Sequence, residues 1–461
     1  MGTFSRAADD PRVGYSPVTG ALLFILGILA ALIGLAISIA LHELGHLSFA
    51  KLFGVRVPQY MVGFGPTIWS RRRKGGETEY GVKAIPLGGY ISMIGMYPPK
   101  AGQKATAQGT GFVSQMIEEG REASAESIPD GEEHRAFYRK PVWQRLLIML
   151  GGPLMNFVIA GICFAVVAVG FGTYQPTTSV DQVYECVVVG GGSNESTEDC
   201  SAPAPGFEAG LLPGDRVVAM DGEPVEEWAQ LQNRIRTSAD EPIRLTVERE
   251  GETLDLTITP IPNEIYVVDP ETGEVAEDEH GEPVTETVGY VGFTAAQQRV
   301  PQDLAFVGEM YGQTVKGITD IVITMPQRVV QMFQAGFLGA ERDPNGPMSV
   351  VGVGRITGEI AAQEQIPIAD RVATIIQIVG TVNIALGVFN LIPLPPLDGG
   401  HVVSALWDGL RRWFAKLRGR PDPGPFDVAK LIPVTMVMAI VWMAIGALFI
   451  FTDIVNPISL F

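Results

Sequence analysis

Three long apolar runs stand out along the chain. They cover Ala21 to Leu41, Leu146 to Gly172 and Leu431 to Phe451. Each run is long enough, as a helix, to cross a hydrocarbon core about 30 Å thick. A fourth run, Val372 to Pro396, contains Gln377, Asn383 and Asn390, and polar groups at membrane depth usually face a protein interior or a wet cavity. The pattern predicts a polytopic α-helical membrane protein with four transmembrane helices.

The segments between these runs have other periodicities. Tyr80 to Ile85 alternates as a strand does and precedes a Gly-Gly pair that we expect to be a turn. Apolar residues at spacings of three and four from Leu304 to Met325 predict an amphipathic helix before Pro326. The stretch from Lys100 to His134 is rich in small and charged residues and is typical of a flexible insertion.

Charge changes the picture in two ways. The formal net charge is -18, which makes nucleic acid an improbable partner, because such a chain repels phosphate backbones. Residues 51–140 carry 13 Lys and Arg against 9 Asp and Glu, whereas residues 176–371 carry 11 against 34. Residues 402–430 are also basic. By the positive-inside rule, the first and last of these segments are cytoplasmic, and the acidic region and both termini are outside.

Two of the five histidines follow the first apolar run directly, in His42-Glu43-Leu44-Gly45-His46. On a helix, imidazoles at i and i+4 project from one face, as a tetrahedral zinc ion requires. Glu43 lies about 100° around the helix, where it can reach a water molecule on the metal without binding the ion itself. A purely structural, polar helix end is the alternative, although ionisable residues so near the membrane core are expensive without a function.

A catalytic zinc ion needs a third protein ligand and one position open to water. Position 52, where metzincins place a third histidine, is Leu52, and the first acidic residue after His46 is Glu77, in a polar stretch with turn signals. Neither soluble pattern is therefore satisfied. The remaining distinctive acid is Asp398, which follows the polar fourth run.

In these motifs the chain resembles the site-2 protease family of bacterial intramembrane zinc metalloproteases. The motifs that carry the resemblance are His42 to His46, Gly63-Phe64-Gly65-Pro66, Pro86-Leu87-Gly88-Gly89-Tyr90, Gly152-Pro153-Leu154-Met155-Asn156, and Asn390 to Gly399 with its Leu-Asp-Gly. The resemblance implies one Zn2+ per chain, bound by His42, His46 and Asp398, with Glu43 as the catalytic base and Asn390 beside the substrate backbone. His401 is outside the family pattern, and we expect a supporting or structural role for it.

The resemblance also implies where and on what the protein acts. It places the chain in the bacterial plasma (inner) membrane, with the active site near the cytoplasmic side. Its substrates would be single-span membrane proteins, such as anti-sigma factors after a first outer cut, or remnant signal peptides. The family places a membrane-associated β-element here, and the edge of the strand with Tyr80, Val82 and Ala84 could receive an unwound substrate by strand addition. A plain cytoplasmic hairpin is the alternative.

Residues 179–262 look like a single extracytoplasmic α/β PDZ domain of the bacterial type. The segment Ala209-Gly210-Leu211-Leu212-Pro213-Gly214-Asp215 carries this resemblance, together with the strand pattern from Ile243 to Ile258. Such a domain would either bind peptide tails and trimmed substrate ends or exclude substrates by size, and the sequence leaves both open. Within these bounds and ahead of the Ala209 to Asp215 segment, Cys186 and Cys200 can form a disulfide on the oxidising side.

The predicted organisation has eight parts. They are 1–50 with the first helix, the cytoplasmic loop 51–143, the second helix in 144–175, the PDZ domain 179–262, an acidic and helical region 263–371, the third helix with Leu-Asp-Gly in 372–400, a basic cytoplasmic loop 401–429, and the fourth helix in 430–461. Two other functions stay open: a catalytically silent membrane scaffold that carries a PDZ domain, and a transporter, since polar groups inside the membrane also mark ion paths.

Overall fold

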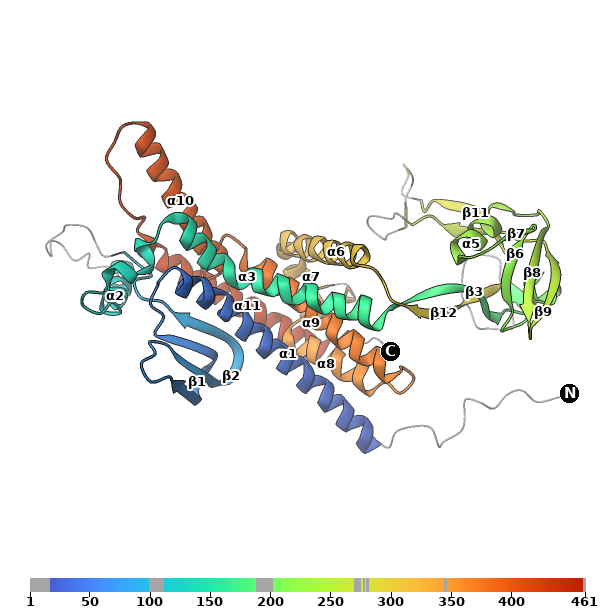
Figure 1. Cartoon of the computed structure of the whole chain (residues 1–461), viewed down its shortest axis with the longest axis horizontal. Coiled ribbons are helices and arrows are strands. Elements are labelled where there is room, and N and C mark those ends of the chain that lie inside the picture. The colour runs from blue at the N-terminus through green and yellow to red at the C-terminus, as the bar shows by residue number, and fades with distance from the viewer. Residues whose placement is uncertain are drawn as a thin grey trace. The chain divides into compact units, whose positions relative to one another are not determined.

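The computed structural model describes residues 17–98, 112–187, 202–268, 275–276, 278, 282–343 and 346–458. The chain forms two compact units. One contains the apolar helices and is built from the segments before Phe171 and after Gln302, and the other is β-rich and spans Gly172 to Pro301 (Figure 1).

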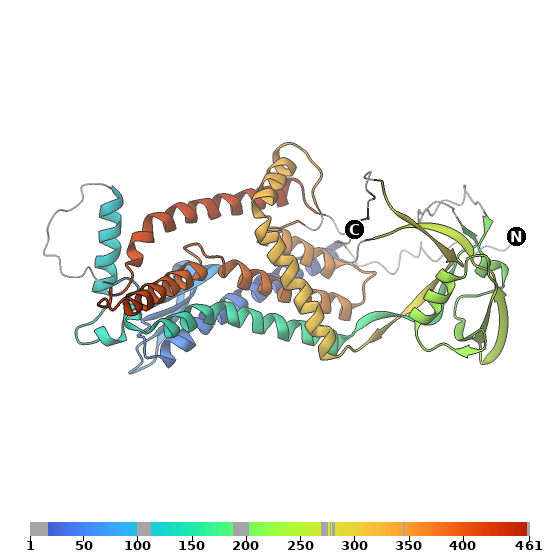
Figure 2. The same ribbon diagram turned by 90° about the horizontal axis from the view of Figure 1, so that it is seen from above.

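The helical unit has two strands near its start and helices elsewhere. Its elements are α1 (Pro17–Leu52), β1 (Gln59–Arg72), β2 (Glu79–Ser92), α2 (Phe112–Glu126), η1 (Glu133–Arg135), η2 (Phe137–Arg139), α3 (Val142–Ala165), η3 (Val166–Phe171), α6 (Leu304–Ile323), α7 (Met325–Phe337), α8 (Val350–Ala362), α9 (Ile368–Asn390), α10 (Asp398–Leu417), η4 (Val428–Leu431) and α11 (Ile432–Val455). α6 crosses over α3 and α9 (Figure 2), and it packs on them through Val307, Tyr311 and neighbouring apolar residues.

Four helical segments within the described residues are long and apolar enough to cross a membrane, as predicted. They are Val18–Leu52, Val142–Phe171, Ile368–Asn390 and Val428–Val455. The third segment differs from its prediction, because it ends at Asn390 and the Leu-Asp-Gly motif begins a separate helix, α10. Pro393, Pro395 and Pro396 lie between the two helices, and proline cannot continue the backbone hydrogen bonds of a helix.

Two further predictions, about segments expected to be cytoplasmic, are wrong in part. Residues 112–126 of the expected flexible insertion form α2, which is anchored where Ser124 Oγ accepts a hydrogen bond from the Tyr97 backbone nitrogen at 2.9 Å. Residues 401–417 of the expected basic loop belong to α10. α10 is amphipathic, and its apolar residues stabilise the helix by packing against neighbouring elements. A count of charges alone does not predict this helix.

β1 and β2 form the β-element expected from the alternation of Tyr80 to Ile85 and from the family resemblance, and the element lies beside α1. Gly88 and Gly89 lie within β2 rather than in a turn, so that prediction was wrong. The hydroxyl of Tyr60, in β1, donates to the Ala40 carbonyl of α1 at 2.6 Å. This bond ties the sheet to the helix that carries the two histidines.

The β-rich unit contains β3 to β12 with two short helices. Its elements are β3 (Thr173–Val183), β4 (Cys186–Val187), β5 (Ala202–Pro203), α4 (Pro205–Glu208), β6 (Arg216–Met220), β7 (Glu223–Pro224), α5 (Trp228–Thr237), β8 (Ile243–Arg249), β9 (Glu252–Ile258), β10 (Ile261–Tyr266), β11 (Thr285–Tyr290) and β12 (Phe293–Val300). The main sheet has the order β12-β3-β6-β8-β9, with β7 paired to β6.

This unit extends beyond the predicted boundary at residue 262. β10 to β12 were expected to belong to an acidic and helical region, yet they are strands, and β12 pairs with β3 along most of its length. The strands are missed in the sequence because half of the β12 residues are polar, without a strict alternation, and because an acidic insertion separates β10 from β11. His280 and most of that insertion lie outside the described residues.

An ion pair joins Asp215, just before β6, to Arg249 at the end of β8. Asp215 is 1% exposed. Its carboxylate accepts hydrogen bonds from Arg249 Nε at 2.6 Å and Nη2 at 2.7 Å, and from the Leu212 backbone nitrogen at 2.9 Å. Burial raises the pKa of Asp215, but the bonds from Arg249 and Leu212 outweigh it and hold the pKa below its ordinary value of 3.8.

We predict that this pair makes the β-rich unit sensitive to acid. A carboxyl group whose folded pKa is depressed stabilises the fold fully above its unfolded pKa and loses that contribution as the pH falls through the folded pKa. Amide exchange of β6 and β8 in the full chain, corrected for intrinsic rates, should show protection that falls below about pH 4. Asp215→Asn should lower protection at pH 7 by about 1.5–3 kcal/mol and flatten this acid limb; an unchanged limb would show that another group causes it.

Candidate metal centre

The two histidines project from one face of α1, as their spacing predicts. The helix continues for ten residues beyond His42, to Leu52, so the motif lies inside the helix rather than at its end. His42 and His46 are 9% and 4% exposed, and their rings meet edge to face with centroids 4.8 Å apart. Burial of two ionisable rings on an apolar helix is costly unless they share a partner.

Asp398 reaches the histidines from a distant part of the chain. It is the first residue of α10 and follows the loop 391–397 that closes α9. The next residue, Gly399, lies so close to this loop that a Cβ atom there would be 2.2 Å from the Ile392 carbonyl oxygen. Only glycine fits this approach, which explains the glycine of the Leu-Asp-Gly motif.

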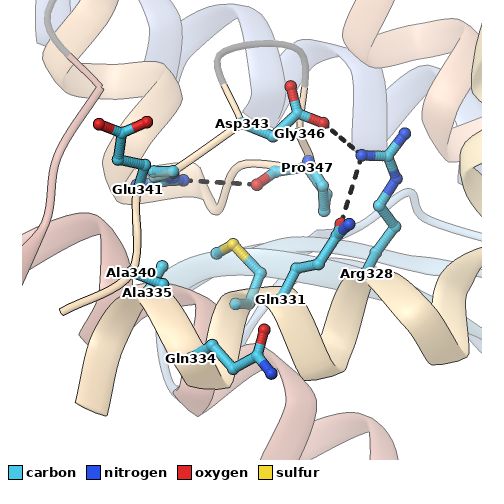
Figure 3. Close-up of a pocket in the computed structure, with 11 residues that line it drawn as sticks. Arg328, Gln331, Gln334, Ala335, Ala340, Glu341, Asp343, Gly346 and Pro347 are labelled. Atoms are coloured by element: carbon cyan, nitrogen blue, oxygen red, sulfur yellow. Dashed lines mark hydrogen bonds and ion pairs between the residues drawn. The ribbon is translucent and has the colours of Figure 1, made fainter. Parts of the chain in front are cut away.

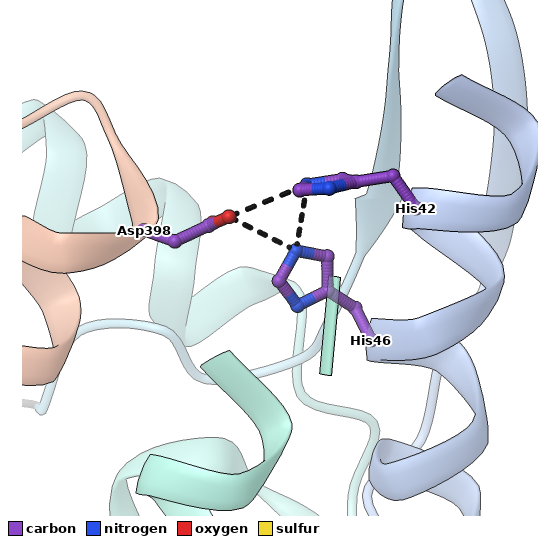
Figure 4. Close-up of side chains that lie close together, drawn as sticks. All are labelled: His42, His46 and Asp398. Atoms are coloured by element: carbon purple, nitrogen blue, oxygen red, sulfur yellow. Dashed lines mark hydrogen bonds and ion pairs between the residues drawn. The ribbon is translucent and has the colours of Figure 1, made fainter. Parts of the chain in front are cut away.

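The three side chains form a nearly equilateral triangle of ligand atoms (Figure 4). His42 Nε2 and His46 Nε2 are 3.2 Å apart, and each lies 3.3 Å from Asp398 Oδ2. Around a tetrahedral zinc ion with ligands at about 2.0–2.1 Å, neighbouring ligand atoms are about 3.3–3.4 Å apart. The triangle therefore fits one face of a tetrahedral site, and two nitrogens with one carboxylate are a donor set typical of catalytic zinc.

The far side of the His46 ring shows which nitrogen is free to bind a metal. Its Nδ1 lies 2.7 Å from the Ile148 carbonyl oxygen, which can only accept, so Nδ1 carries the proton and donates. Nε2 of the neutral ring then presents a lone pair toward the other two ligand atoms. A lone pair that faces a second nitrogen and a carboxylate is repelled unless a proton or a metal cation lies between them.

A cavity of about 610 Å³ opens on this group. Glu43 and Asn390, the predicted base and the predicted substrate-binding amide, both line it together with the three metal-binding candidates. Asn390 is the last residue of α9 and so precedes the loop that leads to Asp398. His401, one turn further along α10, also lines the cavity, although it is outside the group that could hold a metal.

The predicted strand residues lie elsewhere in the sheet. Tyr80 and Val82 each have register partners on two sides, in β1 residues 59–62 and 67–72, and the Tyr80 hydroxyl accepts a hydrogen bond from Lys51 Nζ at 2.8 Å. Neither of them, nor Ala84, is among the residues that line the cavity. Cys200 lies outside the described residues, so its disulfide with Cys186 stays a prediction.

Sequence reasoning missed the segment of β2 that does reach the cavity. Gly88, Gly89, Tyr90 and Ile91 line it, and a Cβ atom at Gly89 would lie 2.9 Å from Cγ of Glu43. Residues 89–92 have register partners on one side only within the described residues, in β1 residues 59–62. The Gly-Gly pair could have indicated this segment, since two glycines inside a strand mark a close approach of another group.

A second cavity lies between α7 and the loop that follows it (Figure 3). Arg328 there pairs with Asp343 and lies 3.4 Å from Gln331 Oε1, and Arg342 pairs with the buried Asp453 of α11. These side chains bond to one another and join helices. They therefore have the features of a structural network rather than of a binding site.

Comparison with known proteins decides the family. The model of peptidase family M50 matches residues 30–421, which include all three metal-binding candidates and Glu43. The chain belongs to peptidase family M50. This membership confirms the resemblance to site-2 proteases and the interpretation of the chain as a membrane peptidase.

Curated relatives cover 80–95% of the chain. It is 31% identical to zinc metalloprotease Rip1 of Mycolicibacterium smegmatis over 455 residues, which is 95% of this chain and 100% of the relative. It is 27% identical to metalloprotease MmpA of Caulobacter vibrioides over 84% of this chain and 88% of the relative. It is 26% identical to zinc metalloprotease RasP of Geobacillus kaustophilus over 80% and 86%.

We predict that Asp398 and His401 differ in their effect on metal binding, although both lie in the first turns of α10 and line the same cavity. Asp398→Ala should weaken zinc binding by more than about 100-fold, beyond the effect of losing a supporting residue. His401→Ala should bind zinc as the unaltered chain does. Competition with a chelator on the purified full chain measures both. Wild-type zinc affinity in Asp398→Ala would remove Asp398 from the ligand set.

Proposed function

We propose that the M50 chain is an intramembrane zinc endopeptidase that cuts single-span membrane proteins in regulated intramembrane proteolysis. The observation that carries this proposal is the triangle of His42, His46 and Asp398, on an apolar helix and open to a cavity shared with Glu43. The predicted cofactor, one Zn2+, agrees with the donor set and with the names of the relatives.

The residues around the triangle have separate chemical roles. Zinc, when bound, activates water and polarises the scissile carbonyl as a Lewis acid. Glu43 takes the proton of the attacking water and gives it to the departing amine. Asn390 offers an amide to the backbone of the substrate beside the scissile bond. Catalysis thus needs one carboxylate that binds metal and one that does not.

The position of the centre along α1 supports a substrate inside the membrane. α1 has 36 residues and is therefore about 54 Å long, which exceeds a hydrocarbon core of about 30 Å. His42 is ten residues, or about 15 Å, from the carboxyl end of this helix. With residues 51–140 in the cytoplasm by their charge, the centre lies toward the cytoplasmic side of the bacterial plasma membrane.

A transmembrane substrate must unwind before it can be cut, because the N–H and C=O groups of a helix are already bonded to each other. The edge of β2 at residues 89–92 can replace those bonds by strand addition. Since a Cβ atom at Gly89 would lie 2.9 Å from Cγ of Glu43, a strand along this edge would lie next to the base. We assign the substrate edge to these residues instead of Tyr80, Val82 and Ala84.

The β-rich unit supports a role in substrate selection. The Ala209–Asp215 turn and the strands β6, β8 and β9 contain the features from which a PDZ domain was predicted. We propose that this unit lies outside the cytoplasm, where a Cys186–Cys200 disulfide would form, and that it either binds trimmed substrate ends or excludes bulky ones. Cleavage of substrates with short and long outer tails distinguishes these two roles.

Glu43→Gln should abolish cleavage of a single-span substrate and leave zinc content unchanged. The variant keeps the size of the side chain but removes the proton acceptor, so loss of about 10²–10⁴-fold in rate is expected. Purified variant and wild type are compared in the same bilayer with zinc measured in both. Cutting at the wild-type rate with normal zinc would contradict the assigned mechanism, whereas failure of the wild type to cut would favour the scaffold as the rival function.

A proline at Ile91 should impair cleavage more than a valine there. Proline has no N–H to donate to a strand added at the β2 edge, whereas valine keeps the backbone and most of the apolar contact. We expect the turnover of Ile91→Pro to fall at least about tenfold with zinc retained, and that of Ile91→Val to stay near wild type. Equal turnover of both variants would count against strand addition at this edge.

A further inference from the structure

The Gly152-to-Asn156 motif of α3 has no role in the account so far, although it lies against the metal centre. Asn156 is 0% exposed. Its Nδ2 lies 3.2 Å from Nδ1 of His42, and its Oδ1 has no hydrogen-bond partner among the described residues. Buried polar atoms nearly always have a partner, so an unpaired amide oxygen beside a metal-binding ring calls for an explanation.

The position of the proton on His42 explains this unpaired oxygen. When Nε2 of a neutral imidazole gives its lone pair to a metal, the proton resides on Nδ1, and Nδ1–H must donate. An amide NH2 group cannot accept that hydrogen bond. Rotation of the Asn156 amide by 180° exchanges Nδ2 with Oδ1 and places an acceptor at the same point. The unpaired oxygen then has a donor at a hydrogen-bond distance.

His46 already has the equivalent arrangement with the same helix. Its Nδ1 donates to the Ile148 carbonyl oxygen at 2.7 Å. Ile148, Gly152 and Asn156 recur at four-residue spacing and therefore lie on one face of α3. Between the two acceptors, a Cβ atom at Gly152 would lie 2.3 Å from His46 Nε2 and 2.6 Å from His42 Nε2. The glycine leaves open the space in which the two ligand atoms meet.

We propose that this face of α3 sets the tautomers of both metal-binding histidines, and that Asn156 is a positioning residue that holds His42 through an oxygen-accepted hydrogen bond from Nδ1–H. An acceptor on the far nitrogen fixes the ring and raises the basicity of the ligating nitrogen. The inference rests on the proposed zinc centre and extends it from α1 and α10 to a third helix.

The chain offers a matched control for the loss of a buried amide. Asn383 of α9 is also 0% exposed with an unpaired Oδ1. Its Nδ2 donates to Ser38 Oγ and to the Val379 carbonyl oxygen, both at 2.8 Å, and it does not contact the metal-binding candidates. Asn383→Leu therefore has the same chemical change inside a membrane helix without the link to His42.

Three variants test the proposal in the purified full chain, with zinc affinity measured by competition with a chelator. Asn156→Leu should weaken zinc binding about 10–100-fold. Asn156→Asp keeps an acceptor for Nδ1–H and should restore affinity to near the wild-type value, while Asn383→Leu should leave it unchanged. Thermal unfolding of the metal-free proteins shows whether each variant is folded, and Asn156→Ala replaces the leucine variant if that one is not.

The outcomes separate this inference from the proposed function. Wild-type zinc affinity in folded Asn156→Leu would overturn the role of Asn156, and so would an Asn156→Asp variant as weak as Asn156→Leu, because that result would require a donor at this position. Equal weakening in Asn383→Leu would also overturn it by showing a general effect of a lost amide. Failure of the unaltered chain to bind zinc would instead contradict the proposed function.

Discussion

Two imidazole nitrogens and a carboxylate oxygen held 3.2–3.3 Å apart are the feature on which the rest of the structure depends. Their lone pairs repel one another in a low-dielectric interior unless a proton or a metal cation lies between them. The surrounding protein must therefore hold the three atoms together before a metal arrives. α1 supplies two of them, and the loop that ends at α10 aims the third.

The packing of α3 between these elements provides that rigidity. At one end α3 faces the histidines through Ile148 and Gly152. One turn before Ile148, Arg145 pairs with Asp408 of α10, and these two residues are 4% and 0% exposed. Asp408 also accepts a hydrogen bond from the Phe426 backbone nitrogen at 3.0 Å. Removing one partner of such a buried pair is costly, so α10 is held to α3 as well as to its own loop.

The features that depend on short-range pattern were predictable from the sequence. Apolar length predicts the four spans, and the His42–His46 spacing predicts one helix face. The end of α9 at Asn390 was not predictable, because it depends on how a proline-rich loop folds back. The role of β2 near Ile91 was not predictable either, because it depends on which strand edge remains unpaired. Asp398 could be assigned to the site only from the resemblance to a family, because it lies 352 positions after His46 and no local periodicity connects the two residues. The strands β10 to β12 were missed because partners distant in the chain stabilise them against a polar pattern.

X-ray absorption at the zinc edge of the purified full chain tests the central claim most directly, which is that His42, His46 and Asp398 form one metal centre. The account predicts one zinc ion with a shell of about four nitrogen and oxygen atoms at about 2.0–2.1 Å, with outer scattering from two imidazoles that is lost in part in His46→Ala. A six-coordinate oxygen shell, sulfur at about 2.3 Å, or imidazole scattering unchanged in His46→Ala would contradict it.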